Sequence, residues 1–389
     1  MPVDRLPLRA LLAFTLTVLL GCLTEVLPAG LLLGMSEDLG VSPSTTGQLV
    51  TVYAVTTAVT AIPLTALTSR LPRKRVLVAL VLGFVVTNLV IAVSPWYSVI
   101  MGARVVSGAV TGVMWSLVAV YAMRIAPPAL AGRALAVAMA GTPVGFAAGV
   151  PAATALGELV GWRWSFAAMA LIAVPLLFWI LVVVPPIQVT TAGSGRTTPA
   201  SSPWAGMRPV LLIVFAYSLG HNVLYTYLGP ALARLGRENL VSTALLAFGA
   251  AAVCGIVVVG SALDRYPRAV LAWCPALTAA GIVSLALSDD AGPILLASAL
   301  WGLAFGGAPT AFQAVTALVA GRSADRAQSL TIAAWNGAVA AGAALGGVVL
   351  NHAAPALPWT AAVLLAVPIL TAVRLPLSAR GTDHALVSE

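Results

Sequence analysis

The chain has 389 residues, of which 60% are hydrophobic and only 8% are charged, and its formal net charge is +8. Soluble domains carry about 25% charged residues, so this composition excludes a water-soluble globule. The basic residues lie in short loops between apolar runs, which excludes a nucleic-acid-binding protein. The three cysteines lie inside apolar runs without paired spacing, so we expect no disulfide, no metal ion and no cofactor.

Twelve apolar runs follow one another along the chain, each close to the roughly 20 residues that cross a bilayer. Inside lipid, helices satisfy the backbone groups of such continuous runs. The sequence therefore predicts an all-α membrane protein with twelve transmembrane helices. The expected spans are residues 9–34, 44–67, 75–94, 97–123, 133–157, 164–185, 209–234, 239–262, 269–288, 292–320, 326–350 and 357–375.

The longest polar stretch, residues 186–207, is rich in Ser, Thr, Gly and Pro and is typical of a flexible linker. It divides the chain into an N-terminal six-helix bundle, 1–185, and a C-terminal six-helix bundle, 208–389. The loops after spans two and eight repeat one motif at an offset of 195 residues. Such internal repeats predict two bundles related by pseudo-two-fold symmetry. The repeated segments are Ser69-Arg70-Leu71-Pro72-Arg73 and Asp264-Arg265-Tyr266-Pro267-Arg268.

The basic residues are divided unevenly between the two sides of the predicted membrane. Sixteen lie on the side of the N-terminus and three on the other side, while Arg104 lies inside a span. Because short cytoplasmic loops carry the excess of Lys and Arg, both termini and the linker are expected in the cytoplasm. The 19 arginines against one lysine favour a GC-rich bacterial genome, so we expect a bacterial plasma membrane.

Glu25 is the sole acidic residue expected inside a span, and Arg104 is the sole basic one. Such charges are costly in lipid and are functional candidates by default. Glu25 lies about 24 Å along its helix from Arg9, and Arg104 lies about 12 Å in from Trp96 at the outer boundary. Their similar depth predicts an Arg–Glu pair, which lowers the cost of both charges. The family resemblance described below implies that this pair has the proton-coupling role. The alternatives are a Glu25 side chain that reaches the outer headgroups or only packs, and an Arg104 that only binds backbone carbonyls.

Aromatic and polar residues recur at helical spacing in several spans. In span four, Arg104, Gly108, Thr111 and Trp115 share one helical face. The pattern predicts an amphipathic substrate cavity with aromatic walls and a few hydrogen-bonding groups. The stripes are alternatively packing surfaces, and His221 is either a second protonatable group or a neutral hydrogen-bonding partner. The predicted cavity residues are Thr111, Trp115, Tyr217, His221, Tyr225, Trp301, Phe305, Trp335 and Asn336.

Two further groups of residues have predicted roles in the motion of the bundles. The repeated loops are expected to bias the conformational state rather than substrate affinity, because contacts there form in one state of a rocking cycle. The predicted gating residues are Arg70, Arg73, Asp264, Arg265 and Arg268. In span five, glycines permit close helix approach and prolines bend the helix, with simple tight packing as the alternative. These residues are Gly141, Pro143, Gly145 and Gly149.

Several segments carry a family resemblance, namely Thr24-Glu25-Val26-Leu27-Pro28-Ala29-Gly30-Leu31-Leu32, Arg104-Val105-Val106-Ser107-Gly108, Gly141-Thr142-Pro143-Val144-Gly145 and Gly161-Trp162-Arg163-Trp164-Ser165-Phe166. They are similar to motifs of the major facilitator superfamily, specifically its twelve-span drug:proton antiporter branch. The sugar-efflux (arabinose-efflux-like) and chloramphenicol-efflux permeases resemble the chain most. There are departures: Ser69 stands where the family's loop motif has Asp, and Thr111 stands where the sugar-efflux group often has His.

The resemblance implies the major facilitator fold and proton-coupled export of small organic molecules, whether drugs, sugars or metabolites, by rocking of two bundles. In the resembled antiporters, spans one, four, seven and ten line the cavity, and span five meets the other half. A proton-coupled sugar or metabolite symporter is the alternative. An intramembrane enzyme is disfavoured, because no span carries a catalytic cluster. The expected partners are a small-molecule substrate, protons and the lipid bilayer, and the chain is expected to act as a monomer.

Overall fold

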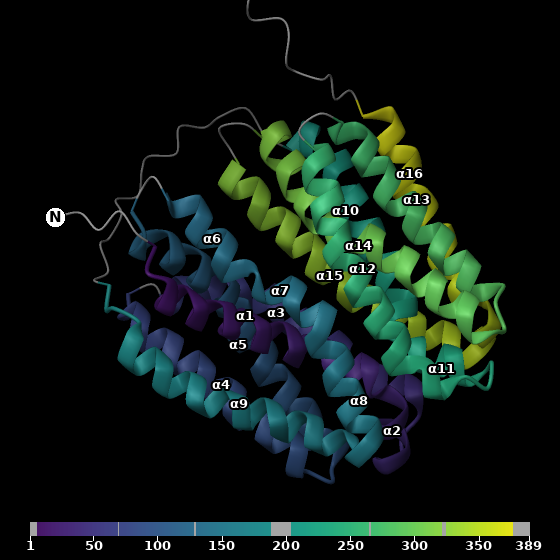
Figure 1. The fold of residues 1–389 in the computed structure, drawn as a ribbon, viewed down its shortest axis with the longest axis horizontal. Coiled ribbons are helices and arrows are strands. Elements are labelled where there is room, and N and C mark those ends of the chain that lie inside the picture. Colours follow the sequence, from purple (N-terminus) through teal and green to yellow (C-terminus); the bar gives the residue numbers. More distant parts are fainter. Residues whose placement is uncertain are drawn as a thin grey trace, which may run out of the picture.

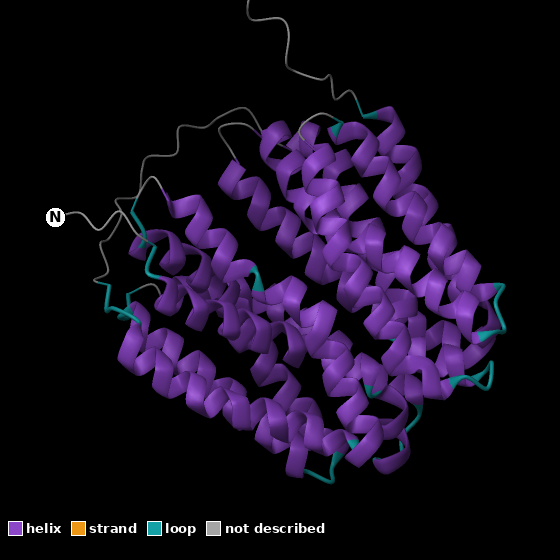
Figure 2. Cartoon of the chain, in the orientation of Figure 1, coloured by secondary structure: helices purple, strands orange, loops and turns teal. Residues whose placement is uncertain are grey.

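The computed structural model describes residues 6–68, 70–127, 130–187, 204–263, 266–320 and 324–375. The regular elements in these residues are all helical (Figure 2). Ten stretches are long and apolar enough to cross a membrane, and one of them, Leu330–Arg374, contains two helices. Helix α3, which has 26 residues, lies outside these stretches and is also long enough to span a bilayer. The predicted twelve-helix membrane fold is confirmed.

The first bundle is coloured purple to teal in Figure 1. It consists of α1 (Leu8–Gly30), α2 (Leu32–Asp38), α3 (Pro43–Thr68), α4 (Arg73–Val93), α5 (Tyr97–Ile125), α6 (Ala131–Met139), α7 (Gly141–Val144), a π-helical segment (Gly145–Gly149), α8 (Val150–Val160) and α9 (Trp162–Val183).

The second bundle is coloured green to yellow in Figure 1. It consists of α10 (Trp204–Tyr225), α11 (Leu228–Ala233), a 3-10 turn (Glu238–Leu240), α12 (Val241–Leu263), α13 (Pro267–Ala286), α14 (Ala291–Ala320), α15 (Ala324–Ala353), a second 3-10 turn (Ala354–Ala356) and α16 (Leu357–Arg374). Helix α10 begins inside the stretch predicted as the linker, of which residues 188–203 lie outside the described part of the chain.

The packing repeats between the bundles. Helix α3 packs on α5 and α4 packs on α9 in the first bundle, as α12 packs on α14 and α13 packs on α16 in the second. The contacts between the bundles repeat as well: α3 of the first bundle packs on α15 of the second, and α12 of the second packs on the π-helical segment and α8 of the first. This exchange of equivalent partners agrees with the predicted pseudo-two-fold relation.

Two of the expected continuous spans are broken near the end that lies away from the start of α1, and a third is broken along its length. The predicted span 9–34 is divided at Leu31 into α1 and α2, and the predicted span 209–234 is divided at Thr226–Tyr227 into α10 and α11. Span five is divided into α6, α7, the π-helical segment and α8, because Pro143 and Pro151 supply no N–H for the carbonyls one turn earlier. The equivalent helix α15 is continuous over 30 residues.

We call the end of the molecule at which α1 begins the basic end, because Arg9, Arg70, Lys74, Arg268 and Arg374 lie at the helix termini there. At the opposite end, α2 contacts α11 and α8 contacts α12, so the two bundles meet (Figure 1). Towards the basic end, the α3 side chains of Val55, Val59 and Leu67 are exposed. The described contacts between the bundles therefore lie mainly towards the end away from the basic residues.

Candidate functional site

Arg104 of α5 is fully buried and holds two other helices of the first bundle. Its Nε donates a hydrogen bond to the Leu49 carbonyl of α3 at 2.9 Å. Its Nη1 donates to the Thr24 carbonyl of α1, and its Nη2 donates to the Glu25 carbonyl at 2.9 Å. The guanidinium carbon also lies 4.2 Å from the centre of the Tyr53 ring, a cation–π contact. One arginine thus joins α1, α3 and α5, in the half of the bundle that lies away from the start of α1.

Pro28 explains why these carbonyls accept bonds from a distant side chain. A proline lacks the N–H that would bond to the carbonyl four residues earlier, which in α1 is that of Thr24. The buried Thr24 oxygen therefore needs another donor, and Arg104 supplies it. The expected Arg104–Glu25 pair thus takes a different form, in which the guanidinium binds the backbone carbonyl of Glu25 rather than its carboxylate.

The Glu25 side chain is half-buried in α1, one residue from the Thr24 carbonyl. Among the described residues, its carboxylate forms no ion pair within 4.0 Å, and the structure gives it no hydrogen bond. The guanidinium of Arg104 is nevertheless near, since it binds the backbone of the same residue. The carboxylate therefore lies in the positive field of Arg104, while its oxygens can still accept a proton or a hydrogen bond from a hydroxyl group.

Three polar residues that lie near this pair complete the site, and one of them, Thr111, is a residue that the sequence predicts for the cavity. The Tyr53 hydroxyl of α3 shares a 2.5 Å hydrogen bond with Thr111, a predicted cavity residue, and lies 3.4 Å from the Gly21 carbonyl. Asn88 of α4 donates to the Thr24 hydroxyl at 3.1 Å. Each of these three side chains is buried. The polar cluster, the name used below, consists of Glu25, Tyr53, Asn88, Arg104 and Thr111.

The second bundle contains a group of packed aromatic rings where the first contains the polar cluster. His221 of α10 is stacked between Phe305, at 4.1 Å between ring centres, and Tyr225, at 4.9 Å. The indole N–H of Trp301 donates a 3.0 Å hydrogen bond to His221 Nδ1. Because an indole nitrogen can only donate, Nδ1 must carry a lone pair, and this geometry favours a neutral imidazole. The contact supports the hydrogen-bonding role among the two that the sequence allowed for His221.

The aromatic cluster, as we call it, gathers six of the predicted cavity residues with three further rings. Phe146, Phe248 and Phe312 are the additions, and Phe146 belongs to the π-helical segment of the first bundle. Its ring centre lies 5.3 Å from that of Phe305. Trp335 joins the cluster at its edge and is partly exposed. The members are Phe146, Tyr217, His221, Tyr225, Phe248, Trp301, Phe305, Phe312 and Trp335.

Two predicted cavity residues lie outside both clusters. Trp115 of α5 is partly buried and packs against the apolar core of the first bundle. Asn336 of α15 donates to the Ile332 carbonyl one turn earlier, at 3.0 Å. The structure therefore gathers most of the predicted cavity residues and places these two apart. Among the described residues, no three His, Cys, Asp or Glu side chains are grouped so that they could hold a metal ion.

The span-five glycines contact helix α1 within their own bundle. A Cβ atom at Gly141 would overlap the backbone of Thr15, and one at Gly149 would meet Leu23 at 2.7 Å. The approach to the other bundle is made by a different glycine, Gly249 of α12, which lies against the backbone of Phe146. Span five thus meets the second bundle at Phe146 as well as through α8, while its glycines pack on α1.

The predicted gating residues are only partly described, since Asp264 and Arg265 lie outside the described residues. Arg70 is exposed, and the Nε of Arg73 is buried without a hydrogen-bond partner in the described part of the chain. Arg268, at the start of α13, donates to the Val373 carbonyl at the end of α16. Lys74 does the same in the first bundle, from the start of α4 to the Leu181 carbonyl of α9 at 2.8 Å. Arg268 and Lys74, which occupy neighbouring rather than equivalent positions of the repeat, therefore bind the ends of helices in their own bundles.

At the opposite end, Tyr227 seals the contact between the bundles. Its hydroxyl donates to the Ala343 carbonyl of α15 at 2.8 Å, and its ring lies at Gly346. A Cβ atom at Gly47 of α3 in the first bundle would overlap this hydroxyl. Gly47 of the first bundle and Gly346 of the second thus form a notch that holds the Tyr227 side chain. Any side chain at position 47 would fill this notch.

A second contact at this end joins Glu158 to Ser242. The backbone N–H of Ser242, near the start of α12, donates to Glu158 Oε1 of α8 at 3.2 Å. A carboxylate is favourable beside the free N–H groups at a helix start. Glu158 therefore caps a helix of the other bundle. Sequence reasoning found neither this residue nor Tyr227, because their partners lie in the other half of the chain.

A sequence profile of the Major Facilitator Superfamily matches residues 13–236 and 210–384. The chain belongs to the major facilitator superfamily. This membership makes it a multi-pass membrane transporter and not an enzyme, as the sequence predicts. The solved structure of the human organic anion transporter MFSD10 (TETRAN) matches with a TM-score of 0.67 at 15% identity, over 96% of this chain and 100% of that one.

The bacterial relatives are named for efflux or for drug resistance. The chain is 31% identical to a chloramphenicol resistance protein of Streptomyces lividans, over 90% of this chain and 91% of that protein. It is 27% identical to a probable sugar efflux transporter of Mannheimia succiniciproducens, over 89% and 88%. It is also 27% identical to the purine ribonucleoside efflux pump NepI of Escherichia coli, over 87% of each chain.

Proposed function

We propose that this major facilitator protein exports neutral, hydroxylated small molecules in exchange for protons. The three relatives are named for a sugar, a purine ribonucleoside and chloramphenicol. These compounds have hydroxyl groups in common and carry no net charge. A hydroxyl group needs a hydrogen-bond acceptor, and the polar cluster offers one in the Glu25 carboxylate. The aromatic rings of the second bundle suit the flat part of such a substrate.

The observation that carries the proposal is the carboxylate of Glu25, which forms no ion pair with any described residue. A carboxylate held in an ion pair would not be free to exchange protons, whereas here Arg104 is engaged by three backbone carbonyls. An ionised Glu25 accepts a hydrogen bond from a substrate hydroxyl. A protonated Glu25 loses part of that acceptor capacity, so the proton and the substrate compete, and by linkage each weakens the binding of the other.

Competition at one site is sufficient for exchange. If the basic end is cytoplasmic, the described structure is closed at the outer face by Tyr227 and its neighbours. In this state the substrate enters from the cytoplasm and displaces the proton from Glu25. After the bundles rock, an outside proton displaces the substrate. Each proton that returns inward supplies about 2.3 kcal/mol per 100 mV of membrane potential, which drives the substrate outward.

The test uses purified protein in liposomes that contain a pH-sensitive dye. With substrate outside and none inside, an antiporter moves protons outward as substrate enters, so the lumen becomes more alkaline. A symporter, the alternative of the same fold, makes the lumen more acidic. The probes are chloramphenicol, a purine ribonucleoside and a pentose, with a quaternary ammonium dye as the charged comparison. Substrate uptake without any pH change would overturn proton coupling.

A further inference from the structure

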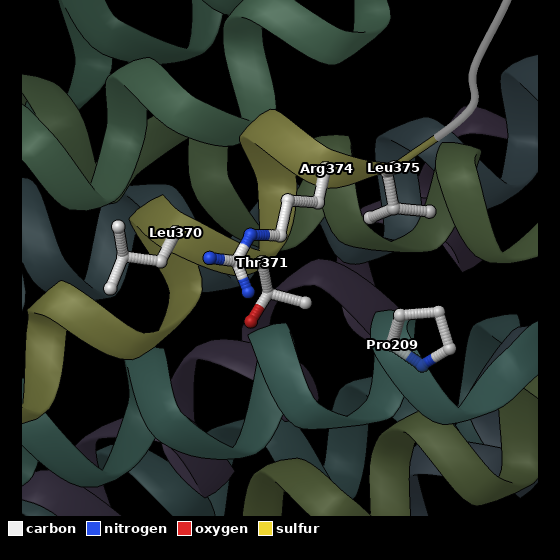
Figure 3. Close-up of a pocket in the computed structure, with 5 residues that line it drawn as sticks. All are labelled: Pro209, Leu370, Thr371, Arg374 and Leu375. Atoms are coloured by element: carbon white, nitrogen blue, oxygen red, sulfur yellow. The ribbon is translucent and has the colours of Figure 1, made fainter.

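A pocket of about 220 Å³ lies at the basic end, between the first turns of α10 and the last turn of α16. Its walls are Pro209 of α10 and Leu370, Thr371, Arg374 and Leu375 at the end of α16. In Figure 3, the Arg374 guanidinium extends beside Thr371, with Leu370 and Leu375 on either side. The pocket thus combines one cationic group with largely apolar walls. None of its lining residues belongs to the polar or the aromatic cluster.

Positive charge accumulates around this pocket. Arg208 precedes Pro209 and is exposed, and Arg268 binds the carbonyl of Val373, the residue before Arg374. Helices α10, α13 and α16 contain no Asp or Glu. Three arginines therefore lie at the same end of three helices that contain no carboxylate, and Asp264, just before α13, lies outside the described residues. Such an arrangement attracts an anion.

The outer surface of α16 continues from this pocket as an apolar strip. Val363, Val367, Leu370 and Arg374 are spaced at i, i+4, i+7 and i+11, so they lie on one face of the helix. The three apolar side chains are 71%, 37% and 59% exposed. On a helix that crosses the bilayer, such a face contacts lipid chains. The strip therefore runs along the helix and ends at a guanidinium where the helix leaves the membrane.

We propose that this pocket binds an anionic phospholipid, with its phosphate at Arg374 and one acyl chain along the α16 strip. Arginine is well suited to phosphate, because its planar group donates two parallel hydrogen bonds. A free phosphate ion would contact the guanidinium but not the apolar strip. A phospholipid would contact both, so the strip favours a lipid over an ion. Bound there, the lipid is in contact with the ends of α10 and α16 in the second bundle.

The test measures lipids retained by the full-length protein in native mass spectrometry. Detergent-purified protein is mixed with phosphatidylglycerol or with phosphatidylcholine of the same acyl chains. The unmodified protein should retain phosphatidylglycerol in preference to phosphatidylcholine. Arg374→Gln should lower phosphatidylglycerol retention about fivefold, as expected for one arginine at a membrane surface. Arg374→Lys, which keeps the charge, should retain most of the binding and shows that the fold tolerates substitution at this position.

Two further variants distinguish a bound lipid from a bound ion. Arg75→Gln removes an exposed charge from the same end of the first bundle, and it should change retention less than about twofold. Leu370→Gln interrupts the apolar strip and should lower retention while the guanidinium is intact. Equal retention of phosphatidylglycerol by Arg374→Gln and the unmodified protein would overturn the proposal. Displacement of the lipid by millimolar inorganic phosphate, or no effect of Leu370→Gln, would overturn it in favour of an ion site.

Discussion

Arg104 provides the hydrogen bond that Pro28 cannot, because the Thr24 carbonyl that Pro28 leaves without a helical donor is bound by the Arg104 guanidinium. A proline in one helix is thereby matched to an arginine in another. These hydrogen bonds hold the part of α1 that contains Glu25 against α3 and α5. They also explain how a fully buried cation is tolerated, since its donors are directed at carbonyl oxygens and at the Tyr53 ring.

This relation predicts a dependence between two substitutions. Arg104→Ala should destabilise the protein by about 1–3 kcal/mol at the Thr24 carbonyl alone, the cost of an unsatisfied buried group. In a Pro28→Ala background the loss should be smaller, because residue 28 then offers an N–H to the same oxygen. A double-mutant cycle on melting temperature in detergent measures the difference. Equal losses in both backgrounds would show that Pro28 and Arg104 act independently.

Glu25→Gln should abolish uphill export while leaving exchange of substrate down its gradient. Glutamine keeps the size and one acceptor oxygen of the protonated carboxyl, but it cannot release a proton. Substrate binding should therefore lose its dependence on pH. The control is Glu37→Gln, which removes an exposed carboxyl of α2 at the opposite end. Proton-driven export by the Glu25 variant, with an unchanged pH profile, would redirect attention to His221.

Gly47→Ala should favour a state that is open at the opposite end. The added methyl group would overlap the Tyr227 hydroxyl, so Tyr227 could not stay in its notch. Val50, which is buried between the bundles, then becomes accessible, and a cysteine placed there should react faster with a soluble thiol reagent. The rate should rise about tenfold for each 1.4 kcal/mol by which the closed state is destabilised.

Gly102→Ala is the matched control for this measurement, because a methyl group there meets no atom within 4 Å. It should leave the labelling rate of the same cysteine unchanged. Slower or equal labelling in Gly47→Ala would mean that Tyr227 does not hold the bundles together.

The orientation in the membrane is open to direct measurement. In a background without the three cysteines, a cysteine at Asp290 should react with an impermeant thiol reagent on intact cells. One at Leu71, which is exposed at the basic end, should react only after the membrane is permeabilised. The reason is the excess of basic residues at the end where Leu71 lies. The reverse labelling pattern would place the basic end outside the cell and invert the direction of the proposed cycle.

The sequence was sufficient for the spans and for the two membrane charges, because long apolar runs and isolated charges are local signals. It was also sufficient to place Glu25 and Arg104 at similar depth. The form of their contact depends on Pro28. Its missing N–H is evident from the sequence, but the sequence does not show that Arg104 of α5 lies close enough to bond to the carbonyl left free. Tyr53 is one of many polar residues in α3, and Asn88 follows Thr87 in α4, so no periodic pattern distinguished either of them.

The contacts between the bundles were harder to predict. Phe146 and Phe248 belong to helices from different halves of the chain, and nothing local to either shows that the other is near. The same is true of Tyr227 and Gly47. The break at Leu31 was missed for a related reason, because hydropathy continues across it without interruption.

The seal at the opposite end has a consequence for organisms that meet changing salinity. The two ion pairs within the described residues, Arg163–Asp38 and Arg237–Asp290, each join residues of a single bundle. The bundles themselves are held across this end by a tyrosine in a glycine notch, by small apolar side chains and by a helix cap. Dissolved salt screens exposed charges, including the Glu158 carboxylate of the helix cap, but it acts weakly on the tyrosine notch and on the apolar contacts that form the rest of the seal. Opening of the transporter should therefore proceed much the same in dilute water and in brine.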